Sequence, residues 1–485
     1  MVTRAKGSSQ AVVACAVVLA ALAAGMDAAR AGYIPVCGGP TYDPATGTGY
    51  TRADYAGGVT NAGLAVGCVE WHEGGIDKGD RAVRWDASGT AVELDCPWVG
   101  RDGYPDAEPA GLNEAGTAVG TFSKYEAGVD KGSQAVRWDA SGTAATELGR
   151  LGTDVNGYAE ISVSDINAAG TAAGWATKYE GGVDRGPRAV RWDAAGTAAT
   201  ELGTLGTYAG GYGWACGHAI NGAGTVVGVG YKLDGGGERA VRWDASGTAA
   251  TELGHLGTGA GGYTGAAAIA VNDAGTALGY AIKFQAGGDK GTRAVRWEAS
   301  GTEATELGHL GTDASGCTYV EPRDINGGGT AVGSARKYEA GVFLGSRAVR
   351  WDASGTAATE LGHLGTGAGG WAETGVSAIN DAGIAVGWAL EYDAAGTDLG
   401  LRAVYWGLDA EAVDLNTLID PASGWTLTCA DVISDTHWVA GVGSFDPDGP
   451  GGLDAYERLF LMQIPEPATL ALLAAGLLVL RRRRR

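Results

Sequence analysis

The chain has 485 residues, of which 86 are glycine and 45% are hydrophobic, and its formal net charge is −21 at pH 7. This hydrophobic content excludes a disordered chain, and the acidic balance excludes a protein that attracts nucleic acid through a basic surface. Small residues interspersed with 15 Trp and 18 Tyr favour a β-rich repeat protein with many turns.

The first 31 residues have the three parts of a secretory signal peptide. A basic start with Arg4 and Lys6 precedes an apolar run at residues 11–25, and a small-residue Ala-Arg-Ala sequence follows at 29–31. This order is typical of a signal that directs export and is then removed. We therefore assign residues 1–31 to a signal peptide.

Residues 32–464 consist of tandem units. One marker is the Trp of Arg-Ala-Val-Arg-Trp-Asp and its variants, which recurs every 51 to 55 residues at Trp85, Trp138, Trp192, Trp243, Trp297, Trp351 and Trp406. A second marker is the Asn of an Asn-x-Ala/Gly-Gly turn, at Asn61, Asn113, Asn167, Asn221, Asn272, Asn326 and Asn380. Two markers with one period establish seven units, and a period near 50 falls in the range of propeller blades.

Each unit contains four candidate strands separated by glycine turns. In the third unit these read VSDIN, TAAGWATKYE, RAVRW and TAATELG. No segment between the two ends of the chain has a helical period. Four short strands in about 53 residues describe one blade of a β-propeller.

An eighth, incomplete unit ends the repeat region. TCADVISDTHWVAGVG matches the first two strands, with Ser434 at the Asn position, and ERLFLMQI replaces the Trp strand. Its fourth strand is missing, but the N-terminal segment GYIPVCGG offers a strand that could pair there and remove the exposed sheet edges. We predict an all-β propeller of eight four-stranded blades with terminal strand closure. Seven blades are the alternative, and an open solenoid comes third.

The recurrent Trp and Arg have structural interpretations. A Trp in every blade is most simply inter-blade packing. The second Arg of Arg-Ala-Val-Arg-Trp recurs with a Glu nine or ten positions later, as in Arg137 and Glu147, so the pair could face each other across a hairpin. We therefore expect a structural ion pair in most blades.

Two recurrent polar positions invite a metal hypothesis. His255, His309 and His363 occupy one position in three successive units, but equivalent residues of neighbouring blades usually lie too far apart to share an ion. Asp77, Asp130, Asp184 and Asp289 recur in a Gly-containing loop, where a lone Asp usually makes a local turn hydrogen bond. Calcium needs six to eight oxygen ligands, and neighbouring loops supply few others. We predict no metal site.

Aromatic residues in the loops between units are the better binding candidates. Counting nine residues back from each marker Asn, or from Ser434, gives Tyr104, Tyr158, Tyr212, Tyr263, Trp371 and Trp425, and only Cys317 breaks the series. These loops also differ most between units. A ring of exposed aromatic side chains could stack on sugars; alternatively, each ring could cap its own blade.

Six cysteines remain after removal of the signal, an even number that permits disulfides in an exported protein. Cys37 and Cys429 lie on the two segments that we expect to pair in the closing blade, so we favour a bond between them. Cys68–Cys96 within one unit is a second possibility, and Cys216 and Cys317 are expected to be free.

The repeat resembles the bacterial HAF-type extracellular repeat. That family combines A-x-x-I-N-x-x-G-x-x-V-G, a His-Ala-Phe-x-Trp strand and D-L-G-T-L-G; here the segments read SAINDAGIAVG, RAVRW and ELGHLGT. Arg-Ala-Val replaces the His-Ala-Phe triplet in most units. The resemblance covers most of residues 50–460 and implies an extracellular repeat protein with no known catalytic residues.

The C-terminal segment, residues 465–485, has three parts in order: Pro465-Glu466-Pro467, an apolar run at residues 468–480, and five arginines. As a helix the apolar run would span about 20 Å, less than the ~30 Å of a hydrocarbon core. The segment resembles the PEP-CTERM sorting signal of Gram-negative bacteria. The resemblance implies transient membrane anchoring through the helix, cleavage by an exosortase-type membrane protease, and delivery to the cell surface or extracellular matrix.

The chain contains no nucleophile elbow, phosphate loop, zinc motif or dinucleotide fingerprint, so we expect neither catalytic residues nor a cofactor. Near-identical units also argue against an active site, which requires asymmetry. The sequence predicts an exported, surface-sorted, non-enzymatic repeat protein that is a structural or interaction module of the cell envelope or extracellular matrix. A lectin-like polysaccharide-binding propeller is the alternative, and a glycan-active enzyme comes third.

Overall fold

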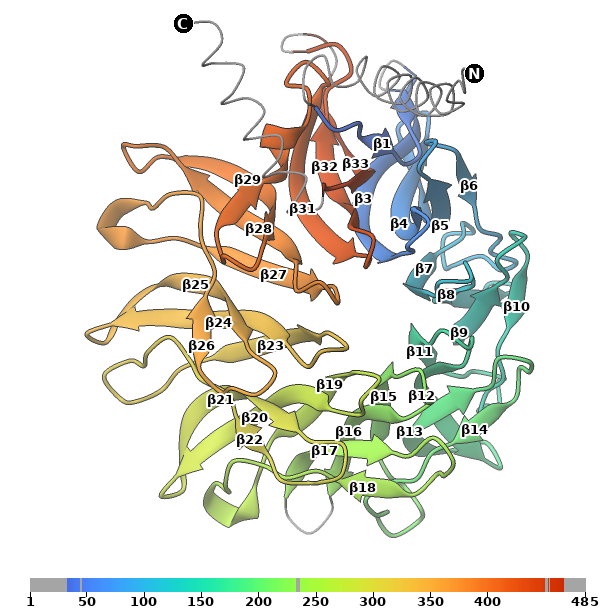
Figure 1. Cartoon of the computed structure of the whole chain (residues 1–485). Coiled ribbons are helices and arrows are strands. Elements are labelled where there is room, and N and C mark those ends of the chain that lie inside the picture. The colour runs from blue at the N-terminus through green and yellow to red at the C-terminus, as the bar shows by residue number, and fades with distance from the viewer. Residues whose placement is uncertain (1–32, 44–45, 233–235, 450–451, 453, 466–485) are drawn as a thin grey trace, which may run out of the picture.

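The computed structural model describes residues 33–43, 46–232, 236–449, 452 and 454–465. The signal peptide and, except for Pro465, the sorting segment lie outside these residues. Eight antiparallel sheets stand in a ring around a central axis, with the first and last sheets side by side (Figure 1). The prediction of eight blades is confirmed, and the seven-bladed alternative is wrong.

Each blade is a meander whose four strands run from the central axis outward. The innermost strands are β3 (Thr48–Val59), β7 (Ala107–Leu112), β11 (Ile161–Ile166), β15 (Ala215–Ile220), β19 (Ala266–Val271), β23 (Val320–Ile325), β27 (Thr374–Ile379) and β31 (Trp425–Ile433). The second strands are β4 (Leu64–Glu73), β8 (Ala118–Glu126), β12 (Ala172–Glu180), β16 (Val226–Lys232), β20 (Ala277–Gln285), β24 (Ala331–Glu339), β28 (Ala385–Tyr392) and β32 (Trp438–Phe445).

The third strands carry the Trp motif or its replacement and are β5 (Ile76–Asp86), β9 (Val129–Trp138), β13 (Val183–Trp192), β17 (Gly237–Trp243), β21 (Gly288–Trp297), β25 (Val342–Trp351), β29 (Asp398–Trp406) and β33 (Tyr456–Gln463). The outermost strands are short: β6 (Ala91–Glu93), β10 (Ala145–Glu147), β14 (Ala199–Glu201), β18 (Ala250–Glu252), β22 (Thr305–Glu306), β26 (Ala358–Glu360), β30 (Ala412–Asp414) and β1 (Cys37–Gly38). A further strand, β2 (Tyr42–Asp43), pairs with β3, and three short 3-10 helices lie in loops: η1 (Ala260–Gly262), η2 (Ala368–Gly370) and η3 (Leu415–Leu418).

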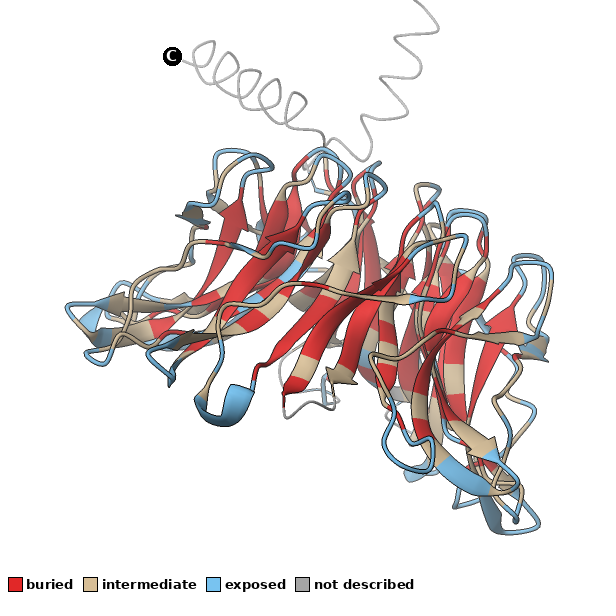
Figure 2. Cartoon of the chain, turned by 90° about the horizontal axis from the view of Figure 1, so that it is seen from below, coloured by how far each residue is buried: buried red, intermediate tan, exposed pale blue. Residues whose placement is uncertain are grey.

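The hydrophobic core lies between neighbouring blades. Buried side chains from two adjacent sheets form each cluster; Val119 and Ala135 of blade 2, for example, pack with Ile161, Val190 and Trp192 of blade 3. Burial follows the middle of the strands, and exposed residues lie in the connections at both edges (Figure 2). Because both faces of every sheet are covered, the strands are rich in Ala and Val on both sides rather than alternating with polar residues.

All seven motif tryptophans have no exposed surface. Six of them also donate a hydrogen bond from Nε1 to the preceding blade, as Trp297 does to the Gly254 carbonyl at 3.0 Å. Each of these six indoles buries roughly 200 Å² while its polar edge is satisfied, whereas the buried Nε1 of Trp85 has no hydrogen-bond partner among the described residues. These contacts agree with the packing role that the sequence predicts.

The two ends of the propeller share the eighth blade. Strand β1 pairs antiparallel with β33, with Cys37 opposite Leu461, so the predicted terminal closure is confirmed. The order of this sheet is β1-β33-β32-β31, which puts Cys37 on its outer edge and Cys429 on its inner edge. Neighbouring strands lie ~4.8 Å apart, so three spacings separate the two cysteines. The predicted Cys37–Cys429 disulfide is therefore wrong.

The other four cysteines of the described residues are also free, and the possible Cys68–Cys96 bond is absent as well. The Cys37 thiol instead donates to the Ala87 carbonyl at 2.8 Å, and the Cys429 thiol donates to Asp431 at 3.1 Å. The eighth blade is closed by backbone pairing and packing.

Candidate functional site

The antiparallel topology gives the propeller two faces with different connections. We call the Asn face the side that carries the Asn turns, between the first and second strands, and the Asp-Ala-Ser-Gly turns, between the third and fourth strands. The loop face carries the hairpins between the second and third strands and the connections from each blade to the next.

Each Asn turn is closed by its own side chain. In blade 6 the Oδ1 of Asn326 accepts from the Thr330 amide at 2.9 Å, and the Gly329 amide donates to the Asn326 carbonyl. Gly329 has φ +87°, a left-handed conformation that suits glycine. In blade 8, His437 takes this position with φ +67° and Ser434 takes the place of the Asn.

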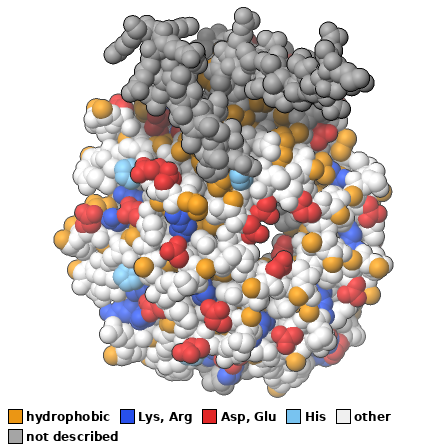
Figure 3. Space-filling model, viewed as in Figure 1, with side chains coloured by type: hydrophobic (Ala, Val, Ile, Leu, Met, Phe, Trp, Pro, Cys, Tyr) orange, Lys and Arg blue, Asp and Glu red, His pale blue; other side chains and the backbone are white. Residues whose placement is uncertain are grey.

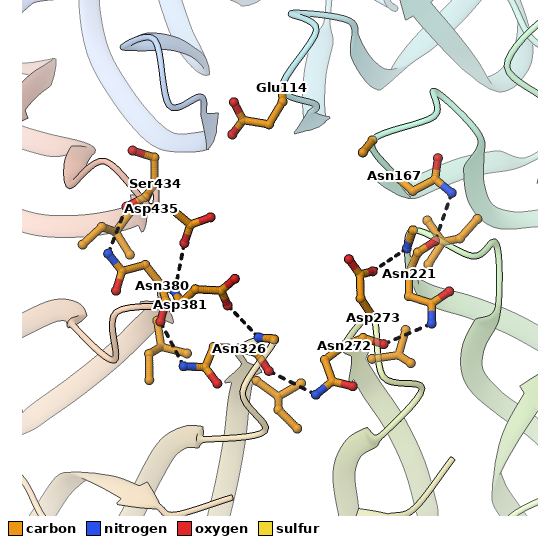
Figure 4. Close-up of a pocket in the computed structure, with 18 of the residues that line it drawn as sticks. Glu114, Asn167, Asn221, Asn272, Asp273, Asn326, Asn380, Asp381, Ser434 and Asp435 are labelled. Carbon is orange, nitrogen blue, oxygen red and sulfur yellow. Dashed lines mark hydrogen bonds between the residues drawn. The ribbon is translucent and has the colours of Figure 1, made fainter. Parts of the chain in front are cut away.

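The same asparagines link neighbouring blades. The Nδ2 of each of six asparagines donates to the backbone carbonyl of the next marker residue, at 3.0–3.3 Å, in a series that ends at the Ser434 carbonyl: Asn113, Asn167, Asn221, Asn272, Asn326 and Asn380. Between blades 8 and 1, the Thr436 hydroxyl and amide donate to Asn61. The side chains of the six asparagines and of Ser434 are buried, and we call the ring that they form around the axis the Asn ring (Figure 4).

The structure corrects the sequence alignment in blade 1. The residue that closes its turn is Thr60, whose Oγ1 accepts from the Leu64 amide at 3.1 Å, rather than the predicted marker Asn61. Gly63 donates to the Thr60 carbonyl, as the other turn glycines do to their Asn. Asn61 therefore corresponds to the residue after the marker in the other blades.

In four blades the residue directly after the marker is acidic and lies at the axis. Glu114, Asp273, Asp381 and Asp435 line a cavity of about 360 Å³ inside the Asn ring (Figure 4), and Figure 3 shows acidic side chains around a central opening. Each carboxylate accepts a backbone amide from the preceding blade; Asp273, for example, accepts from Gly222 at 2.7 Å. These contacts give the acids a structural role.

Deeper buried carboxylates repeat this arrangement on the innermost strands. Asp165 accepts from the amides of Ile166 and, in the next blade, Ile220; Asp324 does the same with Ile325 and Ile379. Burial raises the pKa of Asp165 to about 6, although these two amides oppose the shift. Burial likewise raises the pKa of Asp324.

The arginines of the third strand have different partners from those predicted. Opposite Arg137 in the register is Thr146, and Glu147 faces Val136, so the predicted Arg137–Glu147 pair is wrong. Arg137 instead crosses to blade 3 and donates to four backbone carbonyls, including those of Asp193 and Ala194 at 3.0 and 2.9 Å.

The first Arg of the motif is the one that pairs with the Glu. The Nε of Arg239 lies 3.0 Å from Glu252, and the same bridge occurs at Arg81–Glu93, Arg188–Glu201, Arg293–Glu306 and Arg347–Glu360. The second Arg therefore links its blade to the next one through backbone carbonyls, whereas the first Arg forms an ion pair within its own hairpin.

On the loop face, Asp77, Asp130, Asp184 and Asp289 each accept the amide two residues later, at 2.6–2.7 Å, which is the local turn bond considered above. The basic residue that follows each Asp reaches the next inter-blade loop. Lys78 donates to the Tyr104 hydroxyl, Lys131 to the Asn156 carbonyl and Lys290 to the Ser315 carbonyl. The hairpins thus form a shared framework that positions the loops.

Five of the six predicted aromatic residues lie in the inter-blade loops, whereas Trp425 is the first residue of strand β31, so its predicted loop position is wrong. At these five positions the residue closes the same turn: the amide four residues before it donates to its carbonyl, at Tyr104, Tyr158, Tyr212, Tyr263 and Trp371, as also at Cys317. Their surroundings differ. Tyr212 and Tyr263 are 39% and 42% exposed, whereas Trp371 packs edge-on against Phe343. Tyr104 lies under Lys78, and Trp425 packs against Phe445 and Arg458.

Sequence reasoning missed a second set of variable residues on the strands. The residue after the glycine of each second strand differs between blades: Cys68, Thr121, Trp175, Val229, Tyr280, Ser334, Trp388 and Val442. Its partner on the innermost strand varies too, as in Tyr55, Ser162, Ala267, Glu321 and Gly375. Comparing repeats column by column would have found these positions, because the flanking residues hardly change.

The potential metal-binding groups found within the described residues all lie in blade 1 and at its boundary with blade 2. Asp80 belongs to two of them, one with Asp54 and Cys68 and one with Asp106 and Glu108. Burial, and then the charges of Asp54, Asp106, Glu70 and Glu108, raise the pKa of Asp80 to about 6. Each group offers three donors, fewer than the six to eight that calcium takes.

None of these three groups contains His255, His309 or His363. The Nδ1 of His309 accepts from the Gly311 amide in its own loop. Burial lowers the pKa of His309, so the neutral imidazole is favoured there.

The fold defines an eight-bladed β-propeller whose Asn face carries a ring of side-chain bonds between blades and whose loop face varies from blade to blade. Residues 463–485 match the model of the PEP-CTERM protein-sorting motif, so the chain carries the signal of an exported, surface-sorted bacterial protein. No helix among the described residues has the length and apolarity needed to cross a membrane. No curated protein matches the chain.

Solved structures with a similar strand arrangement are distant in sequence. A prolyl endopeptidase, described in terms of inter-domain dynamics in catalysis and specificity, matches at 10% identity with a TM-score of 0.49, over 86% of this chain and 54% of that one. The β-propeller domain of the Trilobed protease from Pyrococcus furiosus matches at 10% identity and a TM-score of 0.41, over 77% of this chain and 98% of that domain. The chain thus spans about half the length of the prolyl endopeptidase.

Proposed function

We propose that this protein is a non-enzymatic interaction module of the bacterial surface or extracellular matrix, which holds an extracellular partner through its loop face. One observation supports this proposal above all. The blades share the contacts of the Asn face, whereas their side-chain differences gather on the loop face, at the inter-blade loops and the adjoining strand positions. A purely structural ring has no need of such differences, and binding residues often lie on loops held by a rigid scaffold.

Delivery to this location rests on the C-terminal segment. An exosortase-type membrane protease is the partner that the sorting motif suggests, acting on a transiently anchored intermediate in a Gram-negative cell. The HAF-type repeat resemblance supports an extracellular location as well. Both assignments belong to the proposal.

The test is to add the purified, labelled protein to washed cells of a producing strain from which the protein has been deleted. We expect saturable binding to the cell surface and no release of sugars or peptides from it. Absence of saturable binding, or turnover of surface material, would contradict the proposal.

A lectin-like function is the second candidate, favoured by the exposure of Tyr212 and Tyr263 on the loop face. Exposed aromatic rings offer flat apolar surfaces on which a sugar ring can stack. In the same assay, Tyr212→Ala with Tyr263→Ala would weaken binding if these rings form the contact, and unchanged binding would remove them as the site.

A further inference from the structure

Two hollows adjoin each other across blades 5, 6 and 7. The first, of about 310 Å³, lies between blades 5 and 6 and is lined by Tyr280, Thr292 and Tyr319 together with Glu321 and Arg323. The second, of about 350 Å³, lies between blades 6 and 7. Glu321 and Arg323 of β23 line both hollows, so we treat them as one feature, the blade 5–7 groove. Both volumes fall within the ~300–1,000 Å³ of ligand pockets.

Aromatic side chains form the outer walls of the groove. Tyr319 is 44% exposed and has the Arg336 guanidinium 4.2 Å from its ring centroid. Trp388, half-buried, lines the second hollow and is paired across the strands with Gly375. A Cβ at residue 375 would lie 2.6 Å from the Trp388 ring, so only glycine lets the indole rest flat against the innermost strand.

The floor between these rings carries an exposed ion pair and three polar side chains without a hydrogen-bond partner among the described residues. The exposed Glu321 and Arg323 side chains lie 3.4 Å apart. The hydroxyls of Ser334 and Ser346 and the carboxylate of Glu373 line the second hollow and have no hydrogen-bond partner within the described part of the chain. Carboxylates accept and guanidinium groups donate, so the floor offers both kinds of contact.

This combination fits a sugar chain better than an apolar ligand. A pyranose ring has C–H groups that suit the negative face of an aromatic ring and, at its rim, hydroxyls that both donate and accept. Two separate aromatic walls with polar groups between them match consecutive rings of a polymer. The net charge of −21 and the two groove carboxylates disfavour an anionic polymer.

We propose that the blade 5–7 groove binds a short run of neutral hexose units in an extracellular polysaccharide, with sugar rings stacked on Trp388 and on the Tyr280–Tyr319 wall. Glu321, Arg323 and Glu373 hold the hydroxyls between them. This assignment rests on the proposed interaction function and names its ligand class. It also places the contact on the strands of blades 5–7, rather than on the exposed tyrosines of the inter-blade loops.

The test is affinity electrophoresis of the purified protein in native gels that contain galactomannan, hydroxyethyl cellulose, dextran or alginate. We expect retardation by at least one neutral polymer and none by alginate. Trp388→Ala should weaken binding roughly tenfold or more. The matched control is Trp175→Ala, which removes a half-buried Trp at the equivalent strand position of blade 3 and should leave binding unchanged.

A second variant separates loss of binding from loss of folding. Arg323 is exposed, so Arg323→Ala should keep the wild-type melting temperature and still weaken binding. The proposal fails if no neutral polymer retards the wild type, if alginate alone does, if both groove variants bind normally, or if Trp175→Ala weakens binding as much as Trp388→Ala. Saturable binding to cells that survives the groove variants would overturn this assignment and leave the proposed function standing.

Discussion

On the Asn face the blades repeat the same contacts, whereas on the loop face they share a framework and differ in the side chains that it carries. The Asn ring, the arginine bonds and the carboxylate–amide bonds all cross from one blade to the next on the Asn face. On the loop face, the Asp-Lys/Arg-Gly hairpins position the loops, and the neighbouring positions vary from Trp to Ser to Val.

This difference shows how one repeat can provide both rigidity and specificity. Contacts between identical blades must be self-complementary around the ring, so a change in one blade leaves a buried group of its neighbour without a partner. Side chains that face solvent on the loop face carry no such constraint. Three pairs of substitutions would break or sharpen the comparison.

The largest effect should come from Arg296, which donates to four backbone carbonyls of blade 6, including Ala353 at 2.6 Å and Asp352 at 3.0 Å. Arg296→Ala should lower the free energy of unfolding by about 3 kcal/mol, because the variant loses the charge-assisted hydrogen bonds of a buried guanidinium. Chemical denaturation measures the change. The loop-face control Arg336→Ala removes an exposed guanidinium and should cost less than about 1 kcal/mol. Equal losses would remove the distinction between the faces.

Asn326 should have the next largest effect. Asn326→Ala removes the bond to the Asn380 carbonyl and the acceptor for the Thr330 amide, and should cost about 2 kcal/mol in thermal or chemical unfolding. Asn326→Ser should cost about half as much, since a Ser can still accept the turn amide, as Ser434 accepts from Trp438 at 3.0 Å. If Ser proves as costly as Ala, the inter-blade bond rather than the turn carries the whole effect.

The smallest expected effect is an increase in stability, which comes from removing the charge of Asp80. The raised pKa of Asp80 means that the folded protein binds more protons than the unfolded chain between about pH 4 and pH 6, so this group lowers stability as the pH rises through that window. Asp80→Asn should raise the free energy of unfolding at pH 7.5 by about 1 kcal/mol, a gain limited by the half-buried position, and should flatten its dependence on pH.

A carboxylate on the Asn face, Asp273, tests whether the stability gain on removing a charge is confined to the loop face. Asp273 accepts the Gly222 amide, so Asp273→Ala should lower stability at pH 7.5 by about 1 kcal/mol. A stabilising Asp273→Ala would show that both faces carry the same unfavourable charge.

Much of the fold could be predicted because its signals are local. A strand period, a turn glycine and a repeat length are properties of short segments, and they led to eight blades closed by the N-terminal strand. The candidate site was predicted only in part. The nine-residue offset located Tyr158, Tyr212 and Tyr263 correctly within their turns, but it passed over Tyr280 and Trp388, which lie in strands that look like ordinary scaffold.

The sequence by itself determined the repeat, its period, the number of blades and the Trp packing, because these follow from short-range patterns repeated many times. Only the tertiary structure decided which residues meet across blades. Arg137 reaches Asp193 and Ala194 rather than Glu147, Cys37 is three strands from Cys429, and Thr60 rather than Asn61 closes its turn. These outcomes depend on register and on the angle between neighbouring sheets, and no short segment encodes either. The groove of blades 5–7 exists for the same reason, since its walls come from three neighbouring blades that meet only in the tertiary structure.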